Sequence, residues 1–347
     1  MKVAVVSPYA LDQPGGVQDQ VIEMSSRLAQ HGIEAWVVGP GASGPAGARL
    51  LGNAISLPAN GSRAPIALQP SILRRARQAV EGADVVHVHE PLMPMVGWAL
   101  LRDGGIPTVG TFHADPSSLI RSTYRRVSPI GRRMVRNLVG ASAVSEVAAS
   151  AVRPFRPTLE IIPNGLDTAQ YLTKGTKDPH RLVFIGRDEP RKGLDVLLAA
   201  WPTIRTAVPA ATLEVIGAIR SERIEGVRFL GRVDGPEKRR TLTTASIFVA
   251  PNLGGESFGI TLLEGMAAGC AVVASDLPAF TAVGESAASF FPRGDSDALA
   301  RRVTAFLSDE ESLRVAAEAA VRRSSFYDWA TVLPAYILMY RSALSGH

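Results

Sequence analysis

Short apolar runs rich in valine, isoleucine and alanine alternate with longer amphipathic segments, and this alternation constrains the fold more than any other feature of the chain. In the first half, strands are predicted at residues 3–7, 35–39, 85–89, 108–112, near 141–144 and near 160–162, with helices at 17–30 and 72–81. In the second half, strands are predicted at residues 181–185, 212–216, 227–230, 247–250 and 271–274, with helices at 194–207 and 237–244. Such alternation is typical of a doubly wound parallel sheet, so we expect an α/β fold with two Rossmann-like domains.

The alternation restarts after Pro163-Asn164-Gly165, which predicts one domain over residues 1–166 and a second over 167–328. Ligands of parallel sheets bind beyond the carboxyl ends of the strands, so the two domains are expected to face each other across a cleft. A last apolar helix, at about 329–347, has a pattern that fits packing on either domain. A chain of 347 residues with 46% hydrophobic and only 6% aromatic residues fits this architecture better than a β-sandwich.

Cysteine content and hydropathy indicate a cytoplasmic protein. Cys270 is the single cysteine, so no disulfide framework is possible and a reducing compartment fits. The apolar run at residues 2–6 is too short for a signal peptide, and no run reaches membrane-spanning length.

Positive charge is unevenly distributed in a chain whose net charge is +5. Arg74, Arg75 and Arg77 cluster on one predicted helix. A second basic segment contains Arg121, Arg125, Arg126, Arg132, Arg133 and Arg136. Such clusters attract anionic lipid headgroups, so we expect contact with the inner face of a membrane, while the plainer alternative is that they only keep the protein soluble. Nucleic acid is not expected as a partner because aromatic residues do not interleave with the arginines.

Glu256 and Glu264 flank a glycine-rich segment that leads from the strand at 246–250 into a helix expected to open near Ser257. Glu264 lies about six residues, or about 9 Å, into that otherwise apolar helix, and we expect no group nearby to neutralise it. A buried unpaired carboxylate costs several kcal/mol, which a ligand hydroxyl would offset. Free backbone amides at the helix start would hold a phosphate, so the layout fits a nucleotide sugar. The alternative is that both carboxylates reach solvent.

Two other turns are predicted to face the cleft. Pro14-Gly15-Gly16-Val17 follows the first strand and allows a close backbone approach, but the absence of a third glycine argues against NAD. The loop at residues 186–193 places Arg187 and Lys192 where they could neutralise a departing diphosphate, although cations in polar loops are often only solvated.

Histidines follow two of the predicted strands. His113 comes after the strand at 108–112 and could orient a sugar hydroxyl, or could be a hydrogen-bonded loop residue. His87 and His89 share one face of their strand, but no further ligands complete a metal set around them. We therefore expect both to be structural and expect no bound metal.

Six segments together resemble the retaining GT-B glycosyltransferases of family four, and the resemblance spans nearly the whole chain. They are Pro8-Tyr9 to Gln18, His87-Val88-His89-Glu90-Pro91, Thr111-Phe112-His113, Ile162-Pro163-Asn164-Gly165-Leu166-Asp167, Gly186-Arg187 to Gly193, and Gly255-Glu256-Ser257-Phe258-Gly259 to Glu264. Within the family the motifs are most similar to enzymes that transfer mannose from GDP-mannose to phosphatidylinositol. The resemblance implies transfer with retained anomeric configuration, no metal or other cofactor, and a last helix that returns to the first domain.

The resemblance also implies roles for individual residues. Catalytic roles are implied for His113, Arg187, Lys192 and Glu256. Donor binding is implied for Gly16, Arg187, Lys192, Val233, Lys238, Glu256, Ser257, Phe258, Gly259, Ile260 and Glu264, with Val233 and Lys238 at the guanine and Glu264 at the ribose. Acceptor binding is implied for Tyr9, Asp12, Gly15, Asn60, Ser62 and His113.

Several positions depart from the phosphatidylinositol enzymes. Ala59 stands in place of a tyrosine, Pro65 in place of an arginine, and Asp115 lies where a cation for the inositol phosphate is expected. The loop from Arg187 to Lys192 is one residue shorter. Alternatives therefore remain a family-four enzyme with a UDP- or ADP-sugar donor and another acceptor, a nucleotide-sugar epimerase, and a non-catalytic nucleotide-binding protein.

Overall fold

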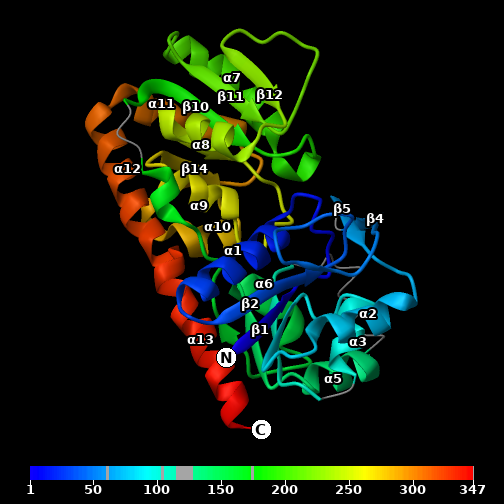
Figure 1. The fold of residues 1–347 in the computed structure, drawn as a ribbon. Helices are drawn as coiled ribbons and strands as arrows, with labels where there is room; N and C mark the ends of the chain where they lie inside the picture. The colour runs from blue at the N-terminus through cyan, green and yellow to red at the C-terminus, as the bar shows by residue number, and fades with distance from the viewer. Residues whose placement is uncertain (60–61, 103–104, 115–127, 173–175, 347) are drawn as a thin grey trace. The chain divides into compact units, whose positions relative to one another are not determined.

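The computed structural model describes residues 1–59, 62–102, 105–114, 128–172 and 176–346 (Figure 1). Contacts divide the chain into two units. The first unit contains Met1–Gly165 and Trp329–His347, and the second contains Leu166–Asp328.

A parallel sheet forms the centre of the first unit, with seven strands among the described residues in the order β3-β2-β1-β6-β7-β8-β9. The strands are β1 (Lys2–Val6), β2 (Glu34–Gly39), β3 (Arg49–Leu50), β6 (Val85–His89), β7 (Thr108–Phe112), β8 (Gly140–Ala143) and β9 (Glu160–Ile161). All residues of β6 and β7 are buried, because helices cover both faces of the sheet. The predicted doubly wound parallel sheet is confirmed.

Helices and one hairpin surround this sheet. The helices are α1 (Gly16–Gln30), α2 (Ser71–Val80), α3 (Val96–Leu101), α5 (Ser128–Arg136) and α6 (Glu146–Val152). An antiparallel hairpin of β4 (Ile55–Ala59) and β5 (Ser62–Ile66) is joined to the end of β1 by a bridge between Tyr9 and Ile66.

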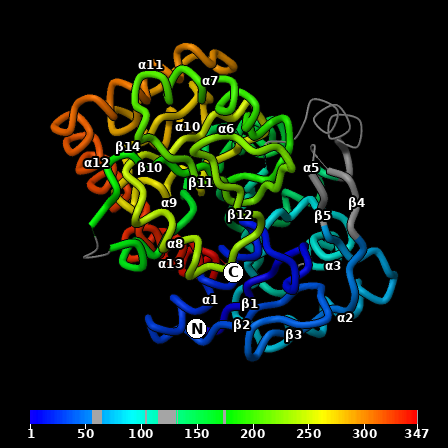
Figure 2. The backbone as a smooth tube through the Cα atoms, turned by 90° about the horizontal axis from the view of Figure 1, so that it is seen from above, coloured from blue at the N-terminus to red at the C-terminus, as the bar shows by residue number. Residues whose placement is uncertain are grey.

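The last helix, α13 (Trp329–Ser345), belongs to the core of the first unit. Trp329, Leu333 and Tyr340 are buried in one cluster with Val3 and Val5 of β1. In Figure 2 the red tube of α13 lies near the blue α1, in agreement with the contacts between these two helices. The first and last segments of the sequence therefore share one core.

The second unit is built around another parallel sheet, with six strands in the described part of the chain in the order β12-β11-β10-β13-β14-β15. The strands are β10 (Asp178–Ile185), β11 (Thr212–Ile216), β12 (Val227–Gly231), β13 (Ala245–Ala250), β14 (Ala271–Ser275) and β15 (Ser289–Phe291). The pattern of strand order, in which β10 pairs with both β11 and β13, is that of a Rossmann-like sheet.

Helices surround the sheet of the second unit, and three of them begin at a capping aspartate. They are η1 (Thr168–Tyr171), η2 (Pro190–Lys192), α7 (Leu194–Ala207), α8 (Gly235–Thr244), α9 (Ile260–Ala267), α10 (Pro278–Gly284), η3 (Glu285–Ala287), α11 (Ser296–Ser308), α12 (Glu310–Ser324) and η4 (Ser325–Tyr327). Asp234, Asp295 and Asp309 each accept a hydrogen bond from a backbone N–H in the first turn of α8, α11 and α12.

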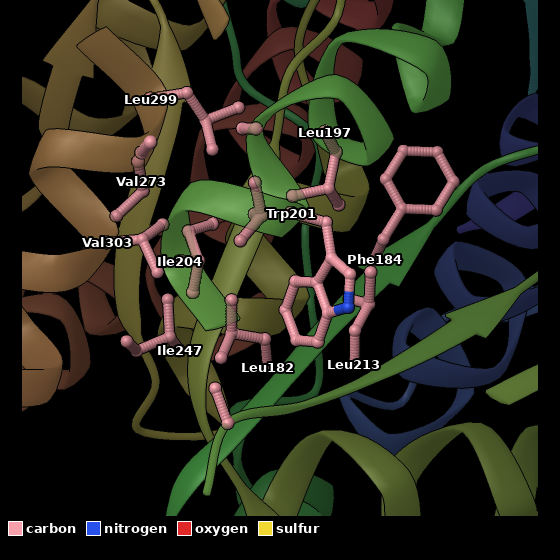
Figure 3. Packing of buried hydrophobic residues seen from close by; sticks show 14 of the residues in the cluster. Leu182, Phe184, Leu197, Trp201, Ile204, Leu213, Ile247, Val273, Leu299 and Val303 are labelled. Carbon is pink, nitrogen blue, oxygen red and sulfur yellow. The ribbon is translucent and has the colours of Figure 1, made fainter. Parts of the chain in front are cut away.

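Trp201 of α7 lies at the centre of the core of the second unit. Figure 3 shows its ring among apolar side chains of β10, β11 and α7, and the indole Nε1 donates to the carbonyl of Glu225 at 2.9 Å. The indole is 1% exposed, so its N–H has the partner that burial requires.

Among the described residues, helices that combine the length and the apolar character needed to cross a bilayer are absent.

We predict that Gly165→Ala destabilises the first unit. A methyl group at this position would lie 2.3 Å from the Trp329 ring, and such overpacking costs about 1–3 kcal/mol. For a domain of this size each kcal/mol lowers the melting temperature by roughly 2–4 °C, which calorimetry would detect. Gly131→Ala is the control, because a methyl group on Gly131 would have no described atom within 4 Å.

A double-mutant cycle makes this prediction sharper. With Trp329→Leu present, the ring that clashes is gone, so Gly165→Ala should cost less than it does alone. Equal costs in the two backgrounds would contradict the proposed contact.

Candidate active site

In the second unit, two loops meet where β10 and β13 end. The first follows β10 over residues 186–193, and the second follows β13 over residues 251–259. Leu253 N–H donates to the carbonyl of Arg191 at 2.8 Å. Gly193 has φ +70°, and a methyl group on it would lie 1.9 Å from the Pro251 carbonyl oxygen. Only glycine permits this approach, which brings the cations of one loop to the carboxylate of the other.

Glu256 is held by both loops. Its Oε1 accepts from Lys192 Nζ in a very short contact and from Asn252 Nδ2 at 2.8 Å. Arg191 Nη1 lies 3.7 Å from the same oxygen. The Glu256 side chain is only 13% exposed, so these donors compensate a charge that has lost most of its water. The structure thus brings together Lys192 and Glu256, two of the predicted catalytic residues.

Arg187 lies on the more open side of the first loop. Its side chain is 56% exposed, and Nε lies 3.2 Å from Glu189 Oε1. The next residue, Asp188, binds Arg220 through both carboxylate oxygens, at 2.8 and 3.0 Å. Those hydrogen bonds from Arg220 lower the pKa of Asp188. Arg220 therefore ties the loop that carries Arg187 to the end of β11.

Glu264 of α9 is buried and has two partners. Its Oε1 accepts from Lys238 Nζ at 2.6 Å and from Tyr171 Oη at 2.9 Å. Burial, with the nearby Glu264 carboxylate as the next cause, raises the pKa of Tyr171 well above its usual range, so the phenol remains a donor. Glu264 Oε2 is buried and makes no hydrogen bond with the described residues. One carboxylate oxygen is therefore fixed by the protein, and the other has acceptor capacity left for a ligand.

These contacts correct one expectation about Glu264. The expectation that nothing nearby neutralises it was wrong, because the fold brings Lys238 and Tyr171 to it. Lys238, for which the resemblance implies a role at the guanine, forms an ion pair with Glu264 in the structure. A second expectation, the start of the helix, is also corrected, because the helix starts later than predicted, at Ile260, after Gly259 with φ +97°. Glu264 is thus the fifth residue of α9, about 6 Å from its start.

The other predicted donor residues occupy this end of the second unit with different exposures. Val233, Ser257 and Ile260 are partly exposed. Phe258 is 4% exposed, and its ring packs edge-on against Tyr327 at 5.6 Å between ring centroids. Its side chain is therefore part of the core, and only its backbone could face a ligand.

In the first unit, Gly15 and Gly16 connect the end of β1 to α1. Gly15 is the extended N-cap of α1, and Gly16 is the first residue of the helix. A methyl group on Gly16 would have no described atom within 4 Å, so open space adjoins the helix start. This space is suited to a ligand group near the backbone amides.

Of the remaining predicted acceptor residues, two are described in full. Asp12 is exposed, and its Oδ2 accepts from Ala42 N–H at 2.7 Å. Tyr9 is half-buried, and its N–H donates to Ser7 Oγ at 3.1 Å. Asn60 and Asp115 lie outside the described residues, as does the side chain of Ser62.

His113 follows β7 and is 6% exposed. Its Nε2 lies 2.7 Å from His89 Nδ1, and the two rings are stacked with centroids 4.9 Å apart. The carboxylate of Glu90 accepts from the backbone N–H groups of His113 at 2.5 Å and Ala114 at 2.6 Å. Burial raises the pKa of Glu90 to about 7, against the opposing effect of these two hydrogen bonds.

The three clustered histidines are buried and neutral at physiological pH. Burial, with His113 as the next cause, lowers the pKa of His87 to about 3. Burial likewise lowers the pKa of His113 to about 3, against a smaller opposing effect of Asn164. His87 binds Tyr340 Oη through Nδ1 and Thr111 Oγ1 through Nε2, both at 2.7 Å. His87 is thus a hydrogen-bonded core residue.

The three arginines predicted to contact a membrane are exposed on α2. Arg75 Nη1 also donates to the Leu51 carbonyl at 3.2 Å, and Arg77 Nε donates to the Ala99 carbonyl at 3.3 Å. Two of the three guanidinium groups therefore also anchor α2 to the first unit. Arg121, Arg125 and Arg126 lie outside the described residues.

Two further observations bear on ligands. Within the part of the chain that the structure describes, no group of three or more His, Cys, Asp or Glu side chains is arranged for a metal ion. A cavity of about 600 Å³ in the second unit is lined by residues including Lys177, Ser246 and Gly269. These residues lie near the amino ends of the strands, whereas Glu256 and Glu264 lie beyond a carboxyl end, so the cavity is separate from the candidate site.

Sequence reasoning missed four residues at these sites: Glu90, Tyr171, Asn252 and Arg220. Asn252 lies between β13 and the Glu256 loop, so its position at a strand's carboxyl end could have identified it. Tyr171 and Arg220 act through contacts that are distant in sequence and carry no local signal.

Family models match both halves of the chain. The model described as Glycosyltransferase Family 4 matches residues 14–170, and the model described as Glycosyl transferases group 1 matches residues 179–309. The phosphatidyl-myo-inositol mannosyltransferase of Mycobacterium leprae is 36% identical, with 100% of this chain and 98% of the relative covered. The enzyme of the same name from Mycolicibacterium smegmatis is 34% identical, with coverages of 100% and 95%.

Solved structures share the fold at lower identity. Anabaena Alr3699/HepE in complex with UDP-glucose has a TM-score of 0.77 at 18% identity, with 100% of each chain covered. Sucrose-phosphate synthase from Thermosynechococcus elongatus has a TM-score of 0.73 at 19% identity, again with complete coverage of both chains. Together with the two Rossmann-like units, these similarities identify the GT-B fold. The chain therefore belongs to glycosyltransferase family 4, and it is a glycosyltransferase related along its whole length to phosphatidyl-myo-inositol mannosyltransferases.

Proposed function

We propose that this enzyme transfers a mannosyl group from GDP-mannose to phosphatidylinositol with retention of the anomeric configuration. The full-length identity of 36% to a mannosyltransferase carries this proposal. The Lys192–Glu256 pair and the buried Glu264 support it, because they offer cations for a diphosphate and carboxylate oxygens for hydroxyl groups. A UDP-sugar donor is the second candidate, because the Alr3699/HepE neighbour was solved with UDP-glucose.

In the proposed reaction, the acceptor hydroxyl oxygen forms a bond to the sugar C1 as the bond from C1 to the diphosphate oxygen breaks. Attack comes from the face on which the diphosphate departs, and the acceptor proton passes to the leaving phosphate oxygen. Arg187 and Lys192 would stabilise the charge that develops on that diphosphate. No metal or other cofactor is required, since these two cations take the part that a metal ion has in other transferases.

Glu256 and Glu264 would bind the donor at two points. Glu256 Oε1 is held by Lys192 and Asn252, which would leave Oε2 for the hydroxyl groups of the sugar. Glu264 Oε2 would accept from the ribose hydroxyls, and the backbone from Ser257 to Ile260 would bind the distal phosphate. Val233 would contact the base. Roles in the transfer step are also proposed for Gly16 and His113.

We also propose that the enzyme works at the cytoplasmic face of a membrane. The exposed Arg74, Arg75 and Arg77 on α2 would attract anionic headgroups, and the lipid acceptor named for its relatives lies in such a surface.

The donor and acceptor are tested together. Purified enzyme with GDP-mannose and phosphatidylinositol vesicles should form a mannolipid, and GDP should raise the melting temperature more than UDP or ADP, because a ligand of the folded state stabilises it. Stronger stabilisation by UDP would overturn the donor. Stabilisation by GDP without mannolipid, together with transfer to another acceptor, would overturn phosphatidylinositol alone.

We predict that Glu264→Gln lowers the affinity for GDP by about tenfold or more, since hydrogen bonds to a charged group contribute about 1.5–3 kcal/mol. Isothermal titration should show a much smaller effect on 2′,3′-dideoxy-GDP, which lacks the hydroxyls. Glu214→Gln is the matched control, because Glu214 is another buried carboxylate of this unit and pairs with Arg228. Equal losses for the two nucleotides would place the ribose elsewhere.

For Lys192→Gln we predict a fall in kcat of about a hundredfold or more, the usual loss when one donor to a developing oxyanion is removed. The KM for GDP-mannose should change less than kcat. Lys177→Gln serves as the control, since Lys177 also donates to a protein oxygen but lies near the amino ends of the strands. A kcat within twofold of wild type would refute the assignment of Lys192.

A further inference from the structure

His89 and His113 share a hydrogen bond whose direction decides which nitrogen of His113 carries its proton. His89 Nδ1 and His113 Nε2 are 2.7 Å apart, and a bond between two neutral rings needs one N–H and one bare nitrogen. Two arrangements are therefore possible. Either His113 donates from Nε2, or His89 donates from Nδ1.

The other nitrogen of His89 distinguishes the two arrangements. His89 Nε2 is buried and makes no hydrogen bond with the described residues. If His113 were the donor, His89 would carry its proton on Nε2, and that buried N–H would have no acceptor among the described residues. If His89 is the donor, the unpartnered Nε2 is a bare acceptor, which proteins tolerate more readily than an orphaned N–H.

The surroundings of His113 favour the same arrangement. With Nε2 occupied by His89, Nδ1 is the ring nitrogen left for other partners. Asn164 interacts with the His113 side chain, and its buried Oδ1 has no other hydrogen-bond partner among the described residues. An acceptor without a donor beside the ring favours a proton on Nδ1.

We infer that His89 is a positioning residue that donates from Nδ1 to His113 Nε2 and thereby fixes His113 as the tautomer protonated at Nδ1. His113 then has no bare nitrogen left to act as a base, and a ligand oxygen that takes the place of Asn164 Oδ1 would accept its neutral Nδ1–H. In the proposed transfer reaction it orients and polarises an oxygen by donating to it. This last role rests on the proposed function, whereas the tautomer does not.

Glu90, the residue next to His89, fixes the backbone on which the His113 ring turns. Its buried carboxylate oxygen Oε1 binds the N–H groups of both His113 and Ala114. Glu90 itself has φ +49°, a conformation that a residue with a side chain adopts at a cost. The end of β6 therefore controls both the ring and the backbone of the residue that follows β7.

The tautomer is tested by two-bond ¹H–¹⁵N spectra of full-length protein labelled with ¹⁵N-histidine, because protonated and bare ring nitrogens have well-separated shifts. The His113 signals are identified as those missing from His113→Gln. We expect a protonated Nδ1 and a bare Nε2 at His113 in the wild-type protein. A protonated Nε2 at His113 would overturn the inference, whatever the enzyme's activity.

Variants of His89 test its causal role. His89→Leu removes the donor and should shift His113 toward the mixture of tautomers of a free imidazole. His89→Asn keeps an N–H donor near the position of Nδ1 and should retain the wild-type tautomer. An unchanged tautomer in a folded His89→Leu protein would overturn the inference. If that variant does not fold, the wild-type spectrum and His89→Asn still decide.

Kinetic measurements distinguish a positioning role of His89 from a purely structural one. His89→Leu should lower kcat by about tenfold or more with the KM for the sugar nucleotide within about twofold, and His89→Asn should restore most of kcat. His31→Asn is the control, because His31 is exposed. Equal loss of kcat in the Leu and Asn variants would contradict the role of the donor. If no transfer is detected with any donor, the proposed function fails and the spectra still report on the tautomer.

Discussion

The burial of two carboxylates, Glu256 and Glu264, is the constraint on which the candidate site depends. Glu256 and Glu264 have lost most of their contact with water, and an isolated charge in that state would cost several kcal/mol. In both cases the protein compensates through one oxygen. Lys192 and Asn252 hold Oε1 of Glu256, while Lys238 and Tyr171 hold Oε1 of Glu264. Each carboxylate is therefore held by two donors in the absence of a ligand, which would lower the entropic cost of binding one.

Much of the fold could be predicted from the sequence, because parallel strands that are buried on both faces appear as continuous apolar runs. The runs at 85–89 and 108–112 coincide with β6 and β7 to the residue. Several elements were missed. Among them, β3 has only two residues, and β4 and β5 form a hairpin that contains prolines. The longer helices α11 and α12 were missed as well, because no element was predicted between residue 274 and the last helix. The start of α9 was misplaced because Gly259 adopts a left-handed conformation that delays the helix, and a glycine permits that conformation without requiring it.

Only the parts of the candidate site that follow from the positions of the strand ends could be predicted from the sequence. The loops that follow β10 and β13 were both predicted to face the cleft, and they meet because these neighbouring parallel strands end at the same edge. The partners of Glu264 were not predictable. Lys238 and Tyr171 are separated from it by 26 and 93 residues, and their contacts depend on how α8 and η1 pack. The same holds for the hydrogen bonds of Glu90, whose motif gave no sign that its carboxylate binds backbone amides.

The place of α13 in the core of the first unit has a consequence for how the chain is made. Trp329 and Tyr340 pack with Val3 and Val5, so this core is incomplete until the last helix has left the ribosome. The second unit occupies one continuous stretch, Leu166–Asp328, so all its residues are synthesised before those of α13. Domains generally fold as units during synthesis. Here the order is reversed relative to the sequence: the part translated second can mature first, and the amino-terminal part must wait for the final residues.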